Sequence, residues 1–268
     1  MCSHLTALFG SAKPFNGQFW TETLCDKGSF GCVIFARKIH TKEDVVIKVE
    51  CGVLRSYNEV AAYKALKGVS SIPRFHCLYT IRDHGMIVLD RLGQNLLKYM
   101  KSCGGSLPIS EVYVLGKALV KILHQIHDRG VIHRDIKPGN IVLPINGELQ
   151  PHLVDFGHAK RYHDETGKHK PESGECAEGT LPYMSIHVHC HTRYSRRDDI
   201  ISLTYTLIHL AKGSLPWCGL SPAECEAMKR ELRWSEITPA PLGLFLEHAE
   251  DLGYEEDPDY SYLEDILG

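Results

Sequence analysis

In the first third of the chain, short runs of β-branched and aromatic residues are separated by polar or glycine-rich turns. Such runs are typical of β-strands, and three of them in succession, joined by short turns, indicate an antiparallel sheet. The predicted strands are Phe19–Leu24, Cys32–Ile39, Val45–Val49, Phe75–Arg82 and Gly85–Asp90. Between the third and fourth strands, apolar residues at helical spacing predict a helix over Arg55–Leu66.

Beyond Gly93 the pattern becomes helical. An apolar stripe that stops before Gly130 predicts a long helix with Ser110 as its N-cap. Two short β-like pieces, Val131–Leu143 and Leu149–Phe156, precede further predicted helices at Ile200–Ala211 and Ala223–Arg233. We therefore expect an α+β fold with a small antiparallel β-rich lobe at about residues 1–92 and a larger, mainly helical lobe at about 93–268. A ligand is expected in the cleft between the lobes.

The composition of the 268 residues is that of a globular protein, with 43% hydrophobic and 24% charged residues. The net charge of −3 gives no general attraction to nucleic acid or to a membrane, so neither is expected as a partner. No apolar run is long enough to span a bilayer, and no signal peptide is recognisable at the start. The ten cysteines show no paired framework, which favours reduced thiols and a location in the cytoplasm or the nucleus.

The strongest chemical signal is the sequence HRDIKPGN over His133–Asn140, followed fifteen residues later by DFG over Asp155–Gly157. Phosphoryl transfer needs an oriented hydroxyl, neutralised phosphate charge and metal ions held at fixed positions. The two motifs supply these groups in order, at a spacing that suits a β-hairpin between them. We therefore predict transfer of phosphoryl from Mg·ATP, rather than a buried polar network with structural duties alone.

Each polar residue of the two motifs has an expected role. Asp135 is the predicted catalytic base that orients the attacking hydroxyl, and Lys137 is predicted to bind the γ-phosphate. The amide oxygen of Asn140 and the carboxylate of Asp155 are the predicted ligands of Mg²⁺. Upstream, Lys48 is predicted to pair with Glu59, eleven residues later, and to position the α- and β-phosphates of ATP.

A glycine-containing loop follows the first predicted strand. Gly28, Ser29, Gly31 and Val33 are predicted to cover the phosphates of ATP, since backbone amides approach phosphate closely where side chains are small. Asp26 stands where the kinase pattern GxGxxG has its first glycine. A carboxylate near a triphosphate is unfavourable, so weakened ATP affinity is expected.

Four further blocks of sequence resemble the casein kinase I family of Ser/Thr protein kinases, and the resemblance covers Gly28–Leu263. The vaccinia-related kinases share some of these blocks and are the nearest rival family. The blocks are Gly179–His187 (GTLPYMSIH), Ser195–Leu203 with SRRDD at its start, Gly213–Trp217 (GSLPW) and Pro258–Leu263 (PDYSYL).

The resemblance implies a bilobal kinase fold, ATP and Mg²⁺ as cofactors, and protein substrates with Ser or Thr acceptors. It also implies a monomer that is active without phosphorylation of its activation loop. By position, Asp90 and Leu92 would bind adenine through their backbone, and Val142 would line the adenine site. Thr180 would hydrogen-bond to the catalytic residues, and Asp199 would anchor the catalytic loop.

Some residues depart from the family pattern. Pro182 stands where the family has an arginine, and Ala223–Glu226 replaces a basic cluster, so recognition of acidic or phosphorylated substrates is in doubt. His158 replaces the leucine after DFG, and Gly139 replaces an aspartate. Asp26, the lost basic residues and His158 keep open a second hypothesis, a pseudokinase that binds ATP or a partner without turnover. A small-molecule kinase of the aminoglycoside type is a weaker third.

Two other groups of residues could have either a functional or a structural role. His187, His189, Cys190 and His191 could form a zinc site, but no paired cysteines accompany them, and a loop near the substrate is favoured. Arg196 and Arg197 could form a cationic patch. We favour structural ion pairs with Asp198 or the activation segment instead.

Overall fold

The computed structural model describes residues 14–27, 31–172, 178–190, 192–231 and 239–268. It divides into two compact units, Met1–Leu92 and Gly93–Gly268. No helix among the described residues has both the length and the apolar character needed to cross a membrane.

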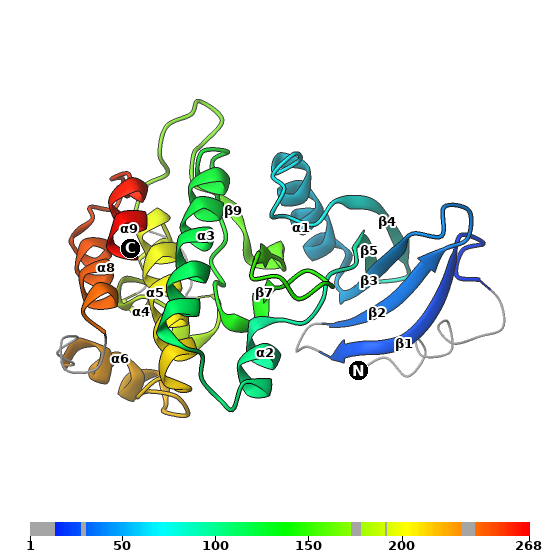
Figure 1. Cartoon of the computed structure of the whole chain (residues 1–268). Helices are drawn as coiled ribbons and strands as arrows, with labels where there is room; N and C mark the ends of the chain where they lie inside the picture. Colours follow the sequence, from blue (N-terminus) through cyan, green and yellow to red (C-terminus); the bar gives the residue numbers. More distant parts are fainter. Residues whose placement is uncertain (1–13, 28–30, 173–177, 191, 232–238) are drawn as a thin grey trace. The chain divides into compact units, whose positions relative to one another are not determined.

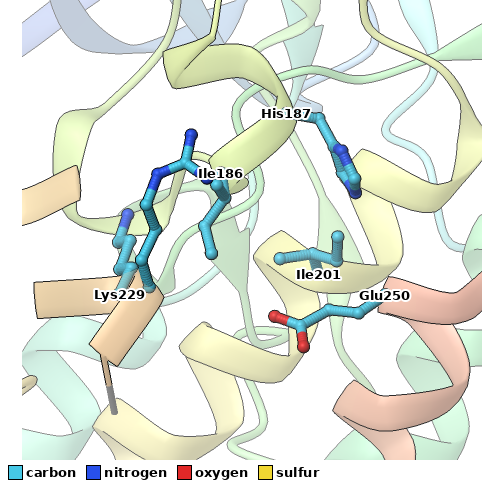
Figure 2. Close-up of a pocket in the computed structure, with 6 residues that line it drawn as sticks. Ile186, His187, Ile201, Lys229 and Glu250 are labelled. Atoms are coloured by element: carbon cyan, nitrogen blue, oxygen red, sulfur yellow. The ribbon is translucent and has the colours of Figure 1, made fainter. Parts of the chain in front are cut away.

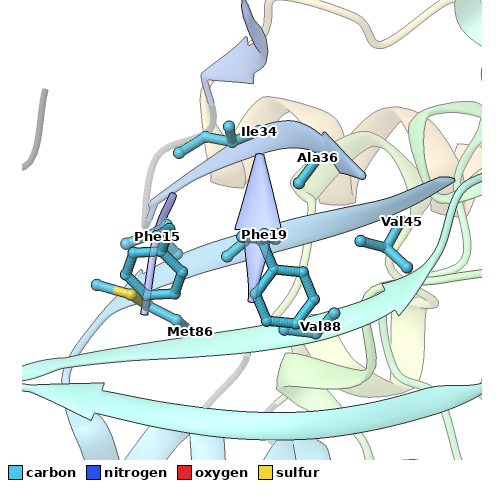
Figure 3. Close-up of a cluster of buried hydrophobic side chains, with 9 residues drawn as sticks. Phe15, Phe19, Ile34, Ala36, Val45, Met86 and Val88 are labelled. Carbon is cyan, nitrogen blue, oxygen red and sulfur yellow. The ribbon is translucent and has the colours of Figure 1, made fainter. Parts of the chain in front are cut away.

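The first unit is built on a five-stranded antiparallel sheet with the strand order β1-β2-β3-β5-β4 (Figure 1). Side chains of four of these strands and of Phe15 form its core, in which Phe19, Ile34, Val45 and Met86 are almost fully buried (Figure 3). The strands are β1 (Phe19–Lys27), β2 (Gly31–Lys38), β3 (Asp44–Cys51), β4 (Phe75–Ile81) and β5 (His84–Asp90).

One helix, α1 (Val53–Ala65), packs against β5, β4 and β3. Its buried side includes Glu59, Val60 and Tyr63, whereas Leu54 and Tyr57 are exposed. The predicted strands and this helix are therefore confirmed, with boundaries that differ by at most three residues. The β-branched runs predict them well because such residues favour strands that pack against a core.

The second unit is mainly helical (Figure 1). Its central helix α5 is buried along most of its length and packs against α3 and α8. The helices are α2 (Leu96–Ser102), α3 (Ile109–His127), α4 (Ile186–His189), α5 (Arg196–Lys212), α6 (Pro222–Glu231), α8 (Ala240–Asp251) and α9 (Tyr260–Ile266).

Short strands and single 3₁₀ turns connect the motif residues in this unit. β7 pairs with β8, and this hairpin joins the HRDIKPGN and DFG segments as the spacing predicted. The short elements are β6 (Val131–Ile132), η1 (Pro138–Asn140), β7 (Ile141–Val142), β8 (His152–Leu153), η2 (Phe156–His158), β9 (Lys160–Arg161) and η3 (Leu181–Tyr183).

Two predictions about this unit were wrong in detail, and one helix was missed. Ser110 is not the N-cap of α3 but its second residue, because Pro108 caps the helix with an extended backbone. Val131–Leu143 is not one β-like piece, since a loop and the turn η1 separate its two short strands. The helix α2 was not predicted, because seven residues are too few to show a helical stripe.

Candidate active site

Lys48 on β3 lies between two buried carboxylates of the first unit. Its Nζ atom is 2.5 Å from Oε2 of Glu59 on α1 and 3.1 Å from Oε1 of Glu50. The pair with Glu59 was predicted, whereas Glu50 was missed. Its position two residues after Lys48 on the same strand was the available signal, because such residues share a face of a sheet. Ser56 also donates to Glu50, at 3.1 Å, so this carboxylate is fixed from the helix side.

The predicted phosphate-covering loop is described only in part. Gly28 and Ser29 lie outside the described residues, as does the side chain of Asp26. Gly31 begins β2, and a Cβ atom there would overlap the carbonyl oxygen of Val49, so only glycine fits. Val33 on β2 lies opposite Lys48 on β3 in the antiparallel sheet.

The residues predicted to bind adenine lie at element ends. Asp90 closes β5, and its carboxylate accepts hydrogen bonds from His76 Nε2 at 2.7 Å and from the backbone amide of Arg74 at 3.2 Å. The carboxylate is therefore engaged in the protein, and the backbone amide of Asp90 donates to the carbonyl of Arg74 at 3.1 Å. Leu92 is the last residue of the first unit, and Val142 is on β7.

Asp135 is the centre of a hydrogen-bonded group in the second unit. Its carboxylate accepts from Lys137 Nζ at 2.7 Å, Asn140 Nδ2 at 2.9 Å and Thr180 Oγ1 at 2.7 Å. Lys137 Nζ also donates to Thr180 Oγ1, at 2.7 Å. The structure thus brings together the four predicted catalytic residues, and the hydrogen bonds expected of Thr180 are present. Asp135 is 5% exposed, so three donors hold a nearly buried anion in one orientation.

Asp199 on α5 fixes the backbone that precedes Asp135. Its two carboxylate oxygens accept from the amides of His133 at 2.7 Å and Arg134 at 2.8 Å. The ring of His127 donates to the same carboxylate at 3.1 Å, while its other nitrogen is 2.6 Å from the hydroxyl of Tyr260. These hydrogen bonds lower the pKa of Asp199 although its burial opposes the shift. The anchoring role predicted for Asp199 therefore has a direct structural basis, and Tyr260 extends it to α9.

Two residues of these motifs hold uncommon backbone conformations. Arg134 has φ 71° and Asp155 has φ 67°, in the left-handed region that costs a non-glycine residue of the order of 1–3 kcal/mol. Such conformations persist where the surroundings enforce them, as His133 does here. Its ring lies 3.1 Å from the carbonyl oxygen of Val154 and 4.8 Å from the ring centroid of Phe156, and so links the two motifs.

The turn after Thr180 is held by side chains from two other segments. Lys229 on α6 is 1% exposed, and its Nζ atom donates to the carbonyls of Leu181 at 3.1 Å and Met184 at 2.7 Å. Trp217 Nε1 donates to the carbonyl of Pro182 at 2.7 Å. Burial lowers the pKa of Lys229 to about 8, since no carboxylate contacts its ammonium among the described residues.

Lys229 also lines a cavity of about 170 Å³ between α4, α5, α6 and α8 (Figure 2). None of the predicted site residues lines it. The lining residues are Ile186, His187, Ile201, Lys229, Arg230 and Glu250. Burial lowers the pKa of His187 to about 4, so its imidazole is neutral at physiological pH and adds no positive charge to the cavity.

The histidine-rich stretch gives no sign of a metal site. His187 and His189 are both on the short helix α4, while His191 lies outside the described residues. Within the described part of the chain, no group of three His, Cys, Asp or Glu side chains around α4 brings its ligand atoms together.

The arginines at the start of α5 are structural. Arg197 pairs with Glu172 of the activation segment at 3.1 Å, as predicted. Arg196 pairs with Asp257, whose side chain is 79% exposed. Neither arginine pairs with Asp198, whose carboxylate instead accepts from the backbone amide of Ser195 at 2.7 Å in a capping box.

A family model described as "Protein kinase domain" matches residues 22–247 of the chain. The match covers most of the chain and extends over parts of both compact units. It includes Lys48, Glu59, the segments around Asp135 and Asp155, and Thr180.

Proposed function

The chain belongs to the protein kinase family, and from this premise we propose that it transfers the γ-phosphoryl group of ATP to Ser and Thr hydroxyls of proteins, in the manner of casein kinase I. The bilobal kinase fold expected from the sequence is confirmed by this match and by the five-stranded antiparallel sheet and the helices. The observation that carries the proposal is the group of donors that converge on Asp135 from Lys137, Asn140 and Thr180.

The donor set fits Mg²⁺. The amide nitrogen of Asn140 donates both to the carboxylate and to the backbone carbonyl of Asp135, at 2.9 Å each, which leaves its amide oxygen for a metal. The Asp155 carboxylate would be the second oxygen ligand, and Mg²⁺ prefers such ligands. When bound, Mg·ATP supplies the phosphoryl group and Mg²⁺ neutralises part of its charge.

The chain's own residues would act on the acceptor. Asp135 would accept the hydrogen bond of the attacking hydroxyl and then its proton, as the acceptor oxygen bonds to the γ-phosphorus and the bond from that phosphorus to the β-phosphate oxygen breaks to release ADP. Lys137 already donates to Asp135 and Thr180, so its ammonium stays within reach of the transferring phosphoryl group as a positive charge. Lys48, oriented by Glu59, would bind the α- and β-phosphates.

The test is transfer of labelled phosphate from ATP to casein in the presence of Mg²⁺, with phosphoamino acid analysis of the product. Asp135→Asn keeps the side-chain shape but removes the base, and should lower the rate at least about a hundredfold. Transfer that persists in this variant would contradict the proposal. Binding of ATP without transfer by the unmodified protein would favour the pseudokinase hypothesis.

The acceptor specificity requires a second comparison. Peptides with an acidic, a pre-phosphorylated or a neutral residue near the serine would be ranked by kcat/KM. We propose that the neutral peptide is used at least as well as the other two, because Pro182 and the segment Ala223–Glu226 supply no cation to bind an anionic neighbour.

A further inference from the structure

The guanidinium of Arg134 is a buried cation next to the catalytic base. Its side chain is 0% exposed, and it lies over the ring of Tyr194 at 4.9 Å. The NH2 group donates to Oε2 of Glu178 at 2.7 Å. A buried guanidinium is costly unless an anion compensates its charge. Among the residues that the structure describes, Glu178 is the carboxylate that does so.

Glu178 begins a three-residue segment that follows the catalytic loop closely. Its carbonyl accepts from the hydroxyl of Tyr194, and Nδ1 of His158 is 3.5 Å from its carboxylate. Gly179 has φ 120°, and a Cβ atom there would come within 2.8 Å of the carbonyl oxygen of Arg134. Thr180 then reaches Asp135. Side-chain and backbone contacts thus tie this segment to the loop at each residue.

In kinases that are switched on by phosphorylation, a phosphate in the activation loop pairs with arginines and orders the segment. The carboxylate of Glu178 corresponds to such a phosphate in this chain, because it is an anion that follows the DFG motif and binds Arg134, the residue before Asp135. Unlike a phosphate, it is present as soon as the chain is synthesised.

We propose that Glu178 is a positioning residue that acts as the permanent counter-ion of Arg134. It holds Gly179 and Thr180 against the catalytic loop, and so keeps Asp135 oriented without any phosphate in the activation segment. This inference rests on the proposed kinase activity and adds the residue that makes the activity constitutive. It also gives a role to His158, which contacts the same carboxylate in place of the family's leucine.

The matched pair of variants is Glu178→Gln and Glu172→Gln. Both glutamates belong to the activation segment, both side chains are 49% exposed, and each pairs with one arginine. Only Glu178 pairs with the arginine next to Asp135. The protein used is first shown by intact-mass spectrometry to carry no phosphate. We then expect Glu178→Gln to lower kcat about 10- to 100-fold, since the substitution removes the counter-ion of a buried charge. The KM of Glu178→Gln for ATP should stay within about twofold of that of the unmodified protein. The kcat of Glu172→Gln should also stay within about twofold.

Chemical rescue separates a lost anion from a damaged fold. Acetate added to Glu178→Ala should restore at least a tenth of the lost kcat, whereas acetamide, which has the same shape and no charge, should not. Equal effects of acetate and acetamide would overturn the counter-ion role. A Glu178→Gln variant as active as the unmodified protein would overturn it as well.

Amide hydrogen exchange tests the positioning without relying on turnover. In Glu178→Gln, peptides that cover residues 131–140 and 178–184 should exchange at least about fivefold faster, and the remainder of the chain should not change. Faster exchange in a chain that transfers no phosphate would support the positioning role and refute only the kinase activity. Unchanged exchange in both peptides would overturn the inference, whatever the activity.

Discussion

Two adjacent buried aspartates on α5, Asp198 and Asp199, should respond oppositely to the same substitution. Each is 0% exposed, yet their surroundings differ. Three N–H donors converge on the two oxygens of Asp199, from the amides of His133 and Arg134 and from the ring of His127. In Asp199→Asn one oxygen becomes an NH₂ group that must face another N–H donor. The variant therefore loses at least one hydrogen bond to an anion and buries a backbone donor without a partner.

Asp198 accepts from only one backbone amide, that of Ser195, and from the hydroxyl of Ser185. In Asp198→Asn the amide oxygen can accept from Ser195, and the NH₂ group can donate to Ser185, whose hydroxyl reverses its role. Burial raises the pKa of Asp198 to about 6, so its charge is unfavourable in the folded state. The same change that disrupts one site is therefore compatible with the other.

The magnitudes separate the two variants clearly. For Asp199→Asn, an uncompensated buried donor and a lost charged hydrogen bond cost about 3–5 kcal/mol, or roughly 6–20 °C of Tm at about 2–4 °C per kcal/mol. For Asp198, the shift from 3.8 to about 6 corresponds to roughly 3 kcal/mol as an upper limit. A raised carboxyl pKa favours folding fully below pH 3.8 and loses that contribution as the pH rises through 6. Asp198→Asn should thus gain stability relative to the unmodified protein between these pH values and keep the gain above them.

The assay is thermal unfolding of both variants from pH 4 to pH 8, together with kcat for phosphate transfer at pH 7.5. Asp199→Asn should unfold earlier at pH 7.5 and lose at least about a hundredfold in kcat, because the backbone before Asp135 is released. Asp198→Asn should melt at or above the temperature of the unmodified protein at pH 7.5 and retain most activity. Equal destabilisation of the two variants would refute this reasoning.

Three further substitutions test other parts of the site, and a fourth, Gly167→Ala, is the control for one of them. Tyr260→Phe removes the hydroxyl that lies 2.6 Å from His127 and should cost about 1–2 kcal/mol in urea unfolding, with a kcat loss of severalfold. Lys229→Met should keep the free energy of unfolding within about 2 kcal/mol of that of the unmodified protein, since the lost hydrogen bonds and the relieved burial of charge offset each other. Steady-state kinetics of this variant should show a higher KM for the protein substrate and an unchanged KM for ATP. Gly179→Ala should lower Tm and kcat together, because a methyl group would press on the carbonyl of Arg134. Gly167→Ala, where φ is 82° and the space is open, should cost only about 1 kcal/mol in the same melting experiment.

The elements and residues that the sequence predicted correctly are those with a local signal. The strands of the first unit follow from β-branched runs, and the group around Asp135 follows from residues at fixed spacing in one motif. Thr180, forty-five residues away, was located only through the family resemblance. Tyr260 was marked only as part of the block Pro258–Leu263, with no indication of its partner His127, and Glu178 had no signal, because Arg134 is distant in the chain and no periodicity connects the two. Such pairs are set by tertiary packing, which spacing along a sequence does not encode.

The pseudokinase hypothesis drew on three departures from the family pattern, and two of them now have an account that does not require lost activity. His158 contacts the carboxylate of Glu178, so a polar residue suits that position. Glu224, within the segment that replaces the basic cluster, makes the reciprocal hydrogen bonds of a capping box with Ser221 and so supports the start of α6. Under the proposed function, loss of basic residues there would change which acceptor is preferred and would leave the hydrogen bonds of Asp135 intact.

The third departure is Asp26, and the two hypotheses predict the same effect of this residue on ATP affinity but differ in turnover. A carboxylate near the triphosphate weakens ATP binding by repulsion, which salt screens, and leaves the bonds to Asp135 unchanged. Replacement by glycine should therefore lower the KM for ATP several-fold at low ionic strength, less so in high salt, and leave kcat the same. A pseudokinase would gain ATP affinity from Asp26→Gly and still transfer nothing, so measuring affinity and turnover on this one variant separates a kinase with weak nucleotide binding from a scaffold.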